Sequence, residues 1–375
     1  MLNRKTVEKT IEELKTSSLP MPMILDRLLM WGDDIYDSFV ALRNCIINKR
    51  VLNSPDIGSC KVDAPVVAVG SGPSLERDLG DLNEIKDKVF IISSETAANK
   101  LIESGIVPDA VSPVERVETP GAMSGAESSW YLGAPYCPCA GNFSKYIMCA
   151  PNTGLSDWLG VKKHLVGSTS GTHAVLTGGI ISRHRTYLIG HDLCFIGGRG
   201  HFKGHPKEYD GIRMQVVCND GQQRESLRLW CRLAGEIALV AKKRSVRTAS
   251  TMGQIINNVT VERLPSRFAL RKSDKTLIVG MPVMAKADFD VKTRKLPHSF
   301  KSCIENVLSS SSMNDILLFS RDENADFFST LYQSLSVQAL VEMSLGKDEA
   351  LCVISFQEAF FNSVESISLE LESVL

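Results

Sequence analysis

Two clusters of residues in this 375-residue sequence are suited to chemistry: a glycine-rich turn and a histidine-rich loop. The turn, Gly70-Ser71-Gly72-Pro73-Ser74, follows the apolar run 66–69 and precedes leucines at helical spacing. Glycines let a backbone approach a ligand closely, Pro73 suits the start of a helix, and amides at a helix amino end favour phosphate or carboxylate. The turn therefore predicts a nucleotide-binding site, although it matches neither GxxxxGK[ST] nor the full GxGxxG pattern. A plain, tight connection between a strand and a helix is the alternative.

The histidine-rich loop follows a predicted strand at 186–189 and carries His191, Asp192, His201 and His205. Its polar groups belong at the same sheet edge as the 70–74 turn, because ligands of open α/β sheets bind at the carboxyl ends of strands. A carboxylate near histidines can do general acid–base chemistry. Asp192 with His201 and His205 could instead bind a metal ion. An ordinary solvated loop is the remaining alternative.

A second helix amino end is predicted at Thr169-Ser170-Gly171-Thr172, before a helix over 172–184. Its hydroxyl and amide groups are donors that could bind an anion. A simple helix N-cap explains the same residues equally well.

Buried-type strands alternate with helices along the middle of the chain. Strands are predicted at 66–69, 89–92, 109–111, 186–189 and 246–249, and helices at 75–85, 97–105, 172–184 and 227–241. Continuous apolar strands alternating with helices are typical of a parallel sheet covered on both faces. Residues 118–160 give no clear pattern, and 196–221 are predicted to form a polar, glycine-rich loop.

The length fits roughly two domains at about 150 residues each. We expect a helical N-terminal segment over 1–62, a nucleotide-binding α/β domain over 63–265, and an accessory region over 266–375. The first segment either packs on the core or makes an oligomer contact. The accessory region includes a predicted strand at 316–319 and an acidic amphipathic helical tail at 348–375.

Composition excludes several classes of protein. The net charge of -1 argues against a nucleic-acid-binding protein. No apolar run is long enough to span a membrane, and the N-terminus lacks the apolar stretch of a secretory signal. The ten cysteines are scattered, which favours reduced, buried thiols and a cytoplasmic protein. Cys137-Pro138-Cys139 is a single pair and therefore a weak zinc motif, so these two are expected to be packing cysteines.

Three motifs in order carry a resemblance to a known family. They are the run 67–75 (VAVGSGPSL), the run 101–109 (LIESGIVPD), and the run 187–195 (YLIGHDLCF) with His201 behind it. In this order they resemble the family that joins bacterial motility accessory factors, which glycosylate flagellin, to archaeal 6-hydroxymethylpterin diphosphokinase. The resemblance covers about 64–265 and implies a Rossmann-like domain similar to that of some sialyltransferases. The sequence departs from the family at Glu115, where an aspartate is usual, and at 169–172, where the family has a glycine-serine-valine turn.

The first activity that the resemblance implies is transfer of a sugar, such as a nonulosonic acid, from a CMP-linked donor to a hydroxyl of a protein such as flagellin or of a glycan. The turns at 70–74 and 169–172 would then hold the nucleotide and its phosphate. The catalytic residues would be His201, which takes the acceptor proton or steadies the leaving phosphate, and Asp192, which orients the loop or the sugar. Further contacts to the substrate would come from Ser94, Glu95, Asp109, Glu115 and His191.

The second implied activity is transfer of diphosphate from ATP to a hydroxymethyl-pterin. It would need Mg²⁺, for which Asp109, Glu115 and Asp192 are the candidate carboxylates. A third alternative is a protein that binds a nucleotide sugar without turning it over. The long segments on both sides of the core resemble the motility-factor architecture, and this analogy favours glycosyl transfer without a firmly implied cofactor.

Overall fold

The computed structural model describes the central part of the chain and short pieces near its C-terminus. The described residues are 44, 48–115, 123–151, 161–205, 212–266, 274–280, 309, 311, 348–351, 353–354 and 356–358. The chain divides into two compact units, one made of 48–151 and 164–285, the other of 1–47, 152–163 and 286–375. The described residues between 349 and 358 are helical, as predicted for that part of the tail. The helices predicted within 1–43 and the strand predicted at 316–319 lie outside the described residues.

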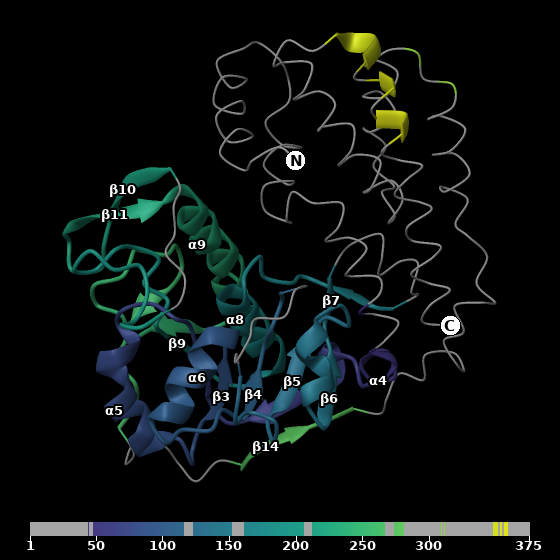
Figure 1. Ribbon diagram of the computed structural model, residues 1–375. Coiled ribbons are helices and arrows are strands. Elements are labelled where there is room, and N and C mark those ends of the chain that lie inside the picture. Colours follow the sequence, from purple (N-terminus) through teal and green to yellow (C-terminus); the bar gives the residue numbers. More distant parts are fainter. Residues whose placement is uncertain are drawn as a thin grey trace. The chain divides into compact units, whose positions relative to one another are not determined.

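The first unit is built on an eight-stranded sheet in which all neighbouring strands are parallel (Figure 1). In spatial order the strands are β13 (Thr260–Val261), β12 (Val246–Thr248), β9 (Thr186–Ile189), β2 (Val66–Val69), β3 (Phe90–Ser93), β4 (Ala110–Val111), β5 (Trp130–Gly133) and β6 (Lys145–Met148). The predicted Rossmann-like α/β class is therefore confirmed.

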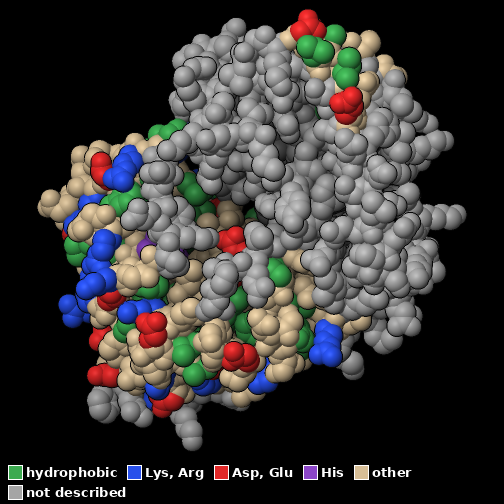
Figure 2. Space-filling view, viewed as in Figure 1, with side chains coloured by type: hydrophobic (Ala, Val, Ile, Leu, Met, Phe, Trp, Pro, Cys, Tyr) green, Lys and Arg blue, Asp and Glu red, His purple; other side chains and the backbone are tan. Residues whose placement is uncertain are grey.

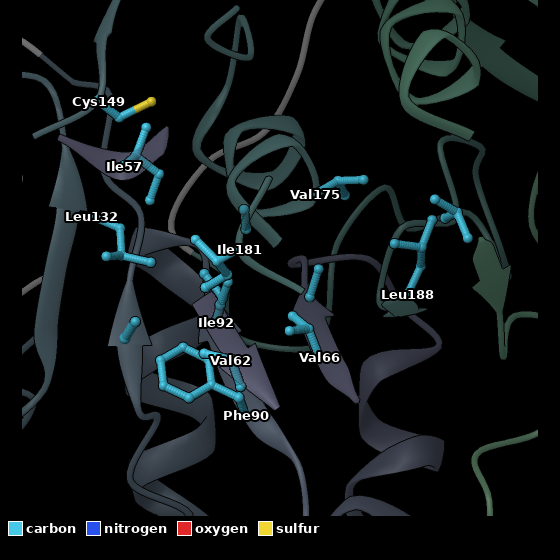
Figure 3. Close-up of a cluster of buried hydrophobic side chains, with 14 of the residues drawn as sticks. Ile57, Val62, Val66, Phe90, Ile92, Leu132, Cys149, Val175, Ile181 and Leu188 are labelled. Atoms are coloured by element: carbon cyan, nitrogen blue, oxygen red, sulfur yellow. The ribbon is translucent and has the colours of Figure 1, made fainter. Parts of the chain in front are cut away.

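Alternate residues of the central strands enter two separate cores, one on each face of the sheet. On β2, Val66 and Ala68 face the core that contains α8 (Ser170–Ile181) and α9 (Arg228–Ala241). Val67 and Val69 face the core that contains α5 (Leu75–Ile85) and α6 (Glu95–Glu103). Figure 3 shows the first core, where residues of β2, β3, β5 and β9 lie against α8. All four β2 residues are completely buried, as the continuous apolar run predicted.

The helices begin at residues whose side chains suit a helix amino end. The first turn of α5 carries Glu76 and Asp78, whose negative charge is favourable there. At the start of α8, Thr169 and Thr172 form a reciprocal capping box. Helix α8 is apolar on nearly every side because it lies between the sheet and α9. Helix α9 buries one stripe that includes Trp230, Ala234 and Ile237, as its helical spacing predicts.

Several strands lie in stretches where the sequence predicted none. Strands β5 and β6 fall in the unpatterned stretch 118–160. The prediction of a loop over 196–221 is wrong in its second half, because β10 (Arg213–Val217) pairs there with β11 (Gln223–Leu227) in an antiparallel hairpin. Only one of the five β10 residues is buried, so the strand lacks the alternation that reveals a half-buried strand.

Short elements lie at the margins of the predicted range 63–265 and within it. Strand β1 (Lys61–Asp63) pairs with β14 (Asp274–Ile278), which extends the unit at both ends of that range. Strand β7 (Ala150–Pro151) pairs with β8 (Lys163–His164) inside it. Helix α4 (Lys49–Leu52) and two 3₁₀ turns, η1 (Ile57–Ser59) and η2 (Pro138–Asn142), complete the described elements. Within the described residues, no helix combines the length and the apolar character needed to cross a bilayer.

Candidate functional site

The sheet reverses its direction of winding between β2 and β9. From β2 the chain runs outward through β3, β4, β5 and β6, whereas β9, β12 and β13 continue on the other side of β2. Such a switch point is where open α/β sheets bind ligands, outside the carboxyl ends of the strands. The 70–74 turn follows β2 and the histidine-rich loop follows β9, so the structure brings the two predicted clusters together at this point.

The backbone of the 70–74 turn is mostly engaged with the histidine-rich loop. Gly70 N donates to Ile189 O at 2.9 Å, and Gly72 N donates to Gly190 O at 2.7 Å. Ser74 N donates to the Asp192 carboxylate at 2.7 Å. Among the described residues, the Ser71 amide is the one N–H of the turn that is left for a ligand. The predicted row of free amides is therefore reduced to Ser71, because the protein itself uses the others.

Close contact between the two loops explains the glycines. A Cβ on Gly70 would lie 2.5 Å from Gly190 O, and a Cβ on Gly190, whose φ is +65°, would lie 2.3 Å from Gly70 O. A Cβ on Gly72 would lie 2.5 Å from an Asp192 carboxylate oxygen. These glycines are needed for packing of one loop on the other, which is a requirement independent of any ligand.

Asp192 fills the anion position at the amino end of α5. One carboxylate oxygen accepts from Ser74 N and the other accepts from the Ser250 hydroxyl, and the residue is buried. A carboxylate at this position is stabilised by the helix dipole and by both hydrogen bonds. The geometry assigns Asp192 to orienting the loop, one of its two predicted roles, and the sequence did not reveal Ser250 as its partner.

His191 lies beneath the two turns with both ring nitrogens close to carbonyl oxygens. Nδ1 lies 3.0 Å from Ile189 O and Nε2 lies 3.0 Å from Gly171 O. Burial lowers the pKa of His191, and the two carbonyl contacts oppose this shift. The buried ring therefore lies between the loop after β9 and the first turn of α8, and in its neutral form it donates to one of the two carbonyl oxygens.

His201 lies directly on the 70–74 turn. Its Nδ1 is 3.2 Å from Ser71 O, and the adjacent Phe202 N also donates to Ser71 O, at 3.0 Å. The imidazole stacks on His205, with 4.0 Å between ring centroids, and its edge meets Trp230 at 6.0 Å. These contacts hold His201 beside the Ser71 amide and hydroxyl, as expected for a residue of the same site.

A cluster of hydroxyl groups lies between the ends of β2 and β3. The Ser71 hydroxyl is 2.6 Å from that of Thr96 and 3.3 Å from that of Ser94. Ser94 and Glu95 are buried at the amino end of α6. We call Ser71, Ser94 and Thr96 the hydroxyl cluster. Thr96 was not among the predicted site residues, although its position two residues after Ser94 at a strand end was a usable signal.

The predicted second helix amino end lies beside this cluster. Thr169 is its N-cap, and the Ser170 hydroxyl donates to Glu95 at 3.2 Å, which joins α8 to α6. Within the described part of the chain, the amides of Ser170 and Gly171 make no hydrogen bond. Both the N-cap interpretation and the donor interpretation of 169–172 are therefore compatible with the geometry.

One further residue holds this amino end. Glu236, on α9, accepts hydrogen bonds from both the amide and the hydroxyl of Ser168. Nothing near Ser168 in the sequence indicated this partner, because the two residues lie far apart in the chain. Glu236 therefore fixes the turn that precedes α8, whereas Glu95 contacts the first residue of the helix.

Asp109 is not brought to this edge of the sheet. It immediately precedes β4, at the amino end of that strand, where Ile91 N and Lys275 Nζ each donate to it at 2.9 Å. Burial raises the pKa of Asp109, and the Lys275 contact opposes this rise. Glu115 follows the carboxyl end of β4 and so lies at the same edge as the turns. The expectation that Asp109 contacts substrate is corrected, because a residue before a parallel strand lies at the opposite edge from residues after one.

The described residues contain no group of three or more His, Cys, Asp or Glu side chains arranged to hold a metal ion. Asp109, Glu115 and Asp192 are thus not assembled as a magnesium site. Cys137 and Cys139 are buried, and burial raises the pKa of Cys137 well above its ordinary value. This agrees with the prediction that they are packing cysteines.

Two comparisons with known proteins find similarity to this chain. Residues 43–198 match the family described as 6-hydroxymethylpterin diphosphokinase MptE-like. The solved structure of an MAf glycosyltransferase from Magnetospirillum magneticum AMB-1 is similar to this chain, with a TM-score of 0.54 and 15% sequence identity. That likeness covers 99% of this chain and 66% of the solved chain, and at this identity it shows the fold. No curated protein matches the sequence.

Proposed function

Because residues 43–198 form an MptE-like domain within a chain that has the fold of an MAf glycosyltransferase, we propose that the protein is a glycosyltransferase that uses a CMP-linked nonulosonic acid. The observation that carries this proposal is the extent of the fold likeness. The diphosphokinase-type family model covers the middle of the chain, whereas the likeness to the glycosyltransferase covers 99% of it. A shared fold raises the expectation of a function, and the site must then support it.

The hydroxyl cluster and the amino end of α8 are the groups proposed to bind the nucleotide. The Ser71 amide and hydroxyl, with the free amides of Ser170 and Gly171, supply donors for a phosphate. The Glu95 carboxylate lies beside Ser170 and would repel a phosphate placed against it, so it suits hydroxyl groups of the ribose or the sugar. The polar groups at the switch point thus divide into an anion-binding part and a hydroxyl-binding part.

His201 is the proposed general base. With Nδ1 protonated and donating to Ser71 O, Nε2 carries the lone pair that a base needs. Nε2 is buried in this structure, so the side chains that cover it must move for an acceptor hydroxyl to reach it. The acceptor hydroxyl oxygen would attack the anomeric carbon of the donor sugar as the bond from that carbon to the phosphate oxygen breaks. The acceptor proton would pass to His201, and CMP would leave with the bonding electron pair.

The test is to incubate the full chain with CMP-linked nonulosonic acids and a flagellin acceptor, and to measure released CMP and added acceptor mass. We expect both products to form in the presence of a chelator. The His201→Ala variant should lose most of this turnover, whereas His184→Ala, at an exposed histidine outside the site, should keep it. CMP release that is the same in His201→Ala and the unchanged protein would contradict the assigned base.

The family match also supports a second candidate, diphosphate transfer from ATP to a hydroxymethyl-pterin. This reaction would use Mg²⁺, but the three carboxylates named for it do not fit one ion. Asp109 lies at the far edge of the sheet, and both Asp192 oxygens are already engaged. AMP release that requires ATP, Mg²⁺ and the pterin together would favour this candidate over glycosyl transfer. Binding of CMP without turnover of any donor would favour the non-catalytic alternative.

A further inference from the structure

Three cysteines gather beside the histidine-rich loop, outside the groups assigned to the proposed reaction. Cys194 and Cys218 are completely buried, and their sulfur atoms are 3.8 Å apart. Cys231, on α9, packs against the same cluster and lies with its sulfur 3.3 Å from the Met214 sulfur. Thiols this close lie near the separation at which a small rearrangement can join them, since an S–S bond is about 2.05 Å long.

The Cys194–Cys218 pair connects the site loop to the β10–β11 hairpin. Cys194 follows Asp192 by two residues, and Cys218 directly follows β10. Backbone contacts hold the two segments together, because Phe195 N donates to Glu225 O at 2.8 Å. The residue between Asp192 and Cys194 is Leu193, whose φ of +51° is unfavourable for a leucine. A bond between the sulfur atoms would therefore act on a constrained loop.

We propose that Cys194 and Cys218 form a reversible oxidation site, which a hydroperoxide converts to a disulfide. In the first step the Cys218 sulfur attacks one peroxide oxygen and the O–O bond breaks. The thiol proton joins the departing hydroxide as water, and Cys218 becomes a sulfenic acid. In the second step the Cys194 sulfur attacks the Cys218 sulfur, and the S–S bond forms as the S–O bond breaks. The Cys194 proton and the hydroxide leave as a second water. The two thiols lose two electrons and two protons, and hydrogen peroxide is reduced to two waters.

The position of Cys218 makes it the thiol that a peroxide reaches first. It directly follows β10, most of whose residues are exposed, whereas Cys194 lies in the loop after β9. The Arg224 guanidinium, which two hydrogen bonds hold on Asp220, lies close to the Cys218 side chain. The Cys194 thiol has its pKa raised by burial, with Cys218 and Asp192 adding to the rise, so it suits the second, resolving step.

Access depends on the hairpin. It forms a two-stranded sheet separate from the eight-stranded sheet, and Figure 1 shows it at the margin of its unit. Most β10 residues are exposed, so its opening costs less buried apolar contact than opening the central strands. We therefore expect oxidation over minutes with millimolar peroxide, rather than the fast reaction of an exposed thiolate.

Disulfide formation would also regulate the nucleotide site, and this part of the inference rests on the proposed function. The two sulfur atoms would approach by about 1.8 Å, given the S–S length of about 2.05 Å. The movement acts two residues from Asp192, whose carboxylate holds the 70–74 turn. We expect the oxidised protein to bind CMP several-fold more weakly, with recovery after reduction.

Tryptic peptide mapping of the full-length protein tests the pair directly. Cleavage after arginine places the three thiols on three peptides, 186–199 with Cys194, 214–224 with Cys218, and 229–232 with Cys231. After hydrogen peroxide and alkylation, we expect peptides 186–199 and 214–224 to be joined with the loss of two hydrogens, and to separate on reduction. A link to the 229–232 peptide, or no link while other thiols oxidise, would overturn the assigned pair.

Two variants complete the experiment. Cys231→Ser should keep the linked peptides, and Cys194→Ser should lose them while circular dichroism shows that it is folded. CMP affinity is then measured before and after oxidation for the unchanged protein and Cys194→Ser. A disulfide without a change in CMP affinity would overturn the regulatory coupling and leave the oxidation site standing. Absence of CMP binding in the reduced protein would count against the proposed function alone, since the peptide map still decides the pair.

Discussion

At the scale of single residues, Asp192 is a clamp between segments rather than a free acid or base. Its two oxygens join the amide of Ser74, which caps α5, to the hydroxyl of Ser250, which follows β12. Replacing the carboxylate would leave the buried Ser74 amide without its acceptor and the helix without its anion. We therefore expect Asp192 to contribute mainly to the stability of the fold.

We expect Asp192→Ala to lower the free energy of unfolding by about 2–3 kcal/mol, because a lost helix cap and an unsatisfied buried donor each cost about 1 kcal/mol or more. Urea unfolding measures this loss. Ser250→Ala removes one of the two hydrogen bonds and should cost about 1 kcal/mol. If Asp192→Ala kept full stability but abolished turnover, the assignment of Asp192 as a clamp would fail and a catalytic role would be favoured.

A second residue-scale prediction concerns His173, which is completely buried in the first turns of α8. Burial lowers its pKa from 6.5 to about 3, and the Leu132 carbonyl opposes this shift only in part. Between pH 3 and 6.5 the unfolded chain therefore binds a proton that the folded chain does not, so stability falls as the pH falls through this window. From pH 7 to pH 5 this residue alone should remove about 2 kcal/mol.

Unfolding in urea at a series of pH values, compared between the unchanged protein and His173→Leu, tests this expectation. The variant should show a shallower pH dependence, although His191, whose pKa is also lowered, contributes in the same direction. His184→Gln is the control, because His184 is largely exposed, and it should keep the original slope. Equal slopes for the unchanged protein and His173→Leu would show that His173 is not buried in its neutral form.

At the scale of elements, the packing of one loop on another decides where glycine is required. Gly72 faces an Asp192 oxygen and Gly190 O, whereas Gly80, in the middle of α5, has open space where a Cβ would lie. A side chain at Gly72 would therefore collide with a buried carboxylate and with backbone. A side chain at Gly80 would meet nothing, so the glycine there only makes the helix less stable, by about 0.5–1 kcal/mol relative to alanine.

Alanine at these two positions should therefore act in opposite directions. We expect Gly72→Ala to lower the unfolding free energy by about 1–3 kcal/mol, as overpacking does. Gly80→Ala should raise it by up to about 1 kcal/mol. Thermal melts of the two variants give the comparison, and a Gly72→Ala protein as stable as Gly80→Ala would refute the close contact of the two loops.

The sequence predicted the elements whose apolar residues form a continuous run or recur at helical spacing. Strands β2, β3 and β9 are continuous apolar runs, and α5 and α9 repeat apolar residues at helical spacing, so periodicity found them. Strand β10 escaped because it is mostly exposed. Among the site residues, the 70–74 turn, Glu95 and His201 were predicted and lie together. Ser250 and Glu236 could not be found, because each hydrogen bonds to a residue that is distant in the sequence. Asp109 was misplaced because its role was taken from the family resemblance, although the strand predicted at 109–111 already put it at the amino end of that strand, away from the turns.

At the scale of the whole molecule, the groups of the candidate site come together at one point of the eight-stranded sheet, between β2 and β9. The segments that follow the three neighbouring strands β9, β2 and β3 meet the amino end of α8 there, and they contribute most of the polar groups of the site. Lys and Arg side chains are interspersed with Asp and Glu on the described part of the face in Figure 2.

The most direct test of this account is a thermal-shift measurement of the full chain with CMP and with ATP, each with Mg²⁺ and with a chelator. A ligand that binds the folded state at a hundred times its dissociation constant stabilises it by about 2.7 kcal/mol. We predict that CMP raises the melting temperature equally with Mg²⁺ and with the chelator, and that Ser71→Ala weakens this effect. A shift produced by ATP with Mg²⁺ and absent with CMP would contradict the account and favour diphosphate transfer at this site.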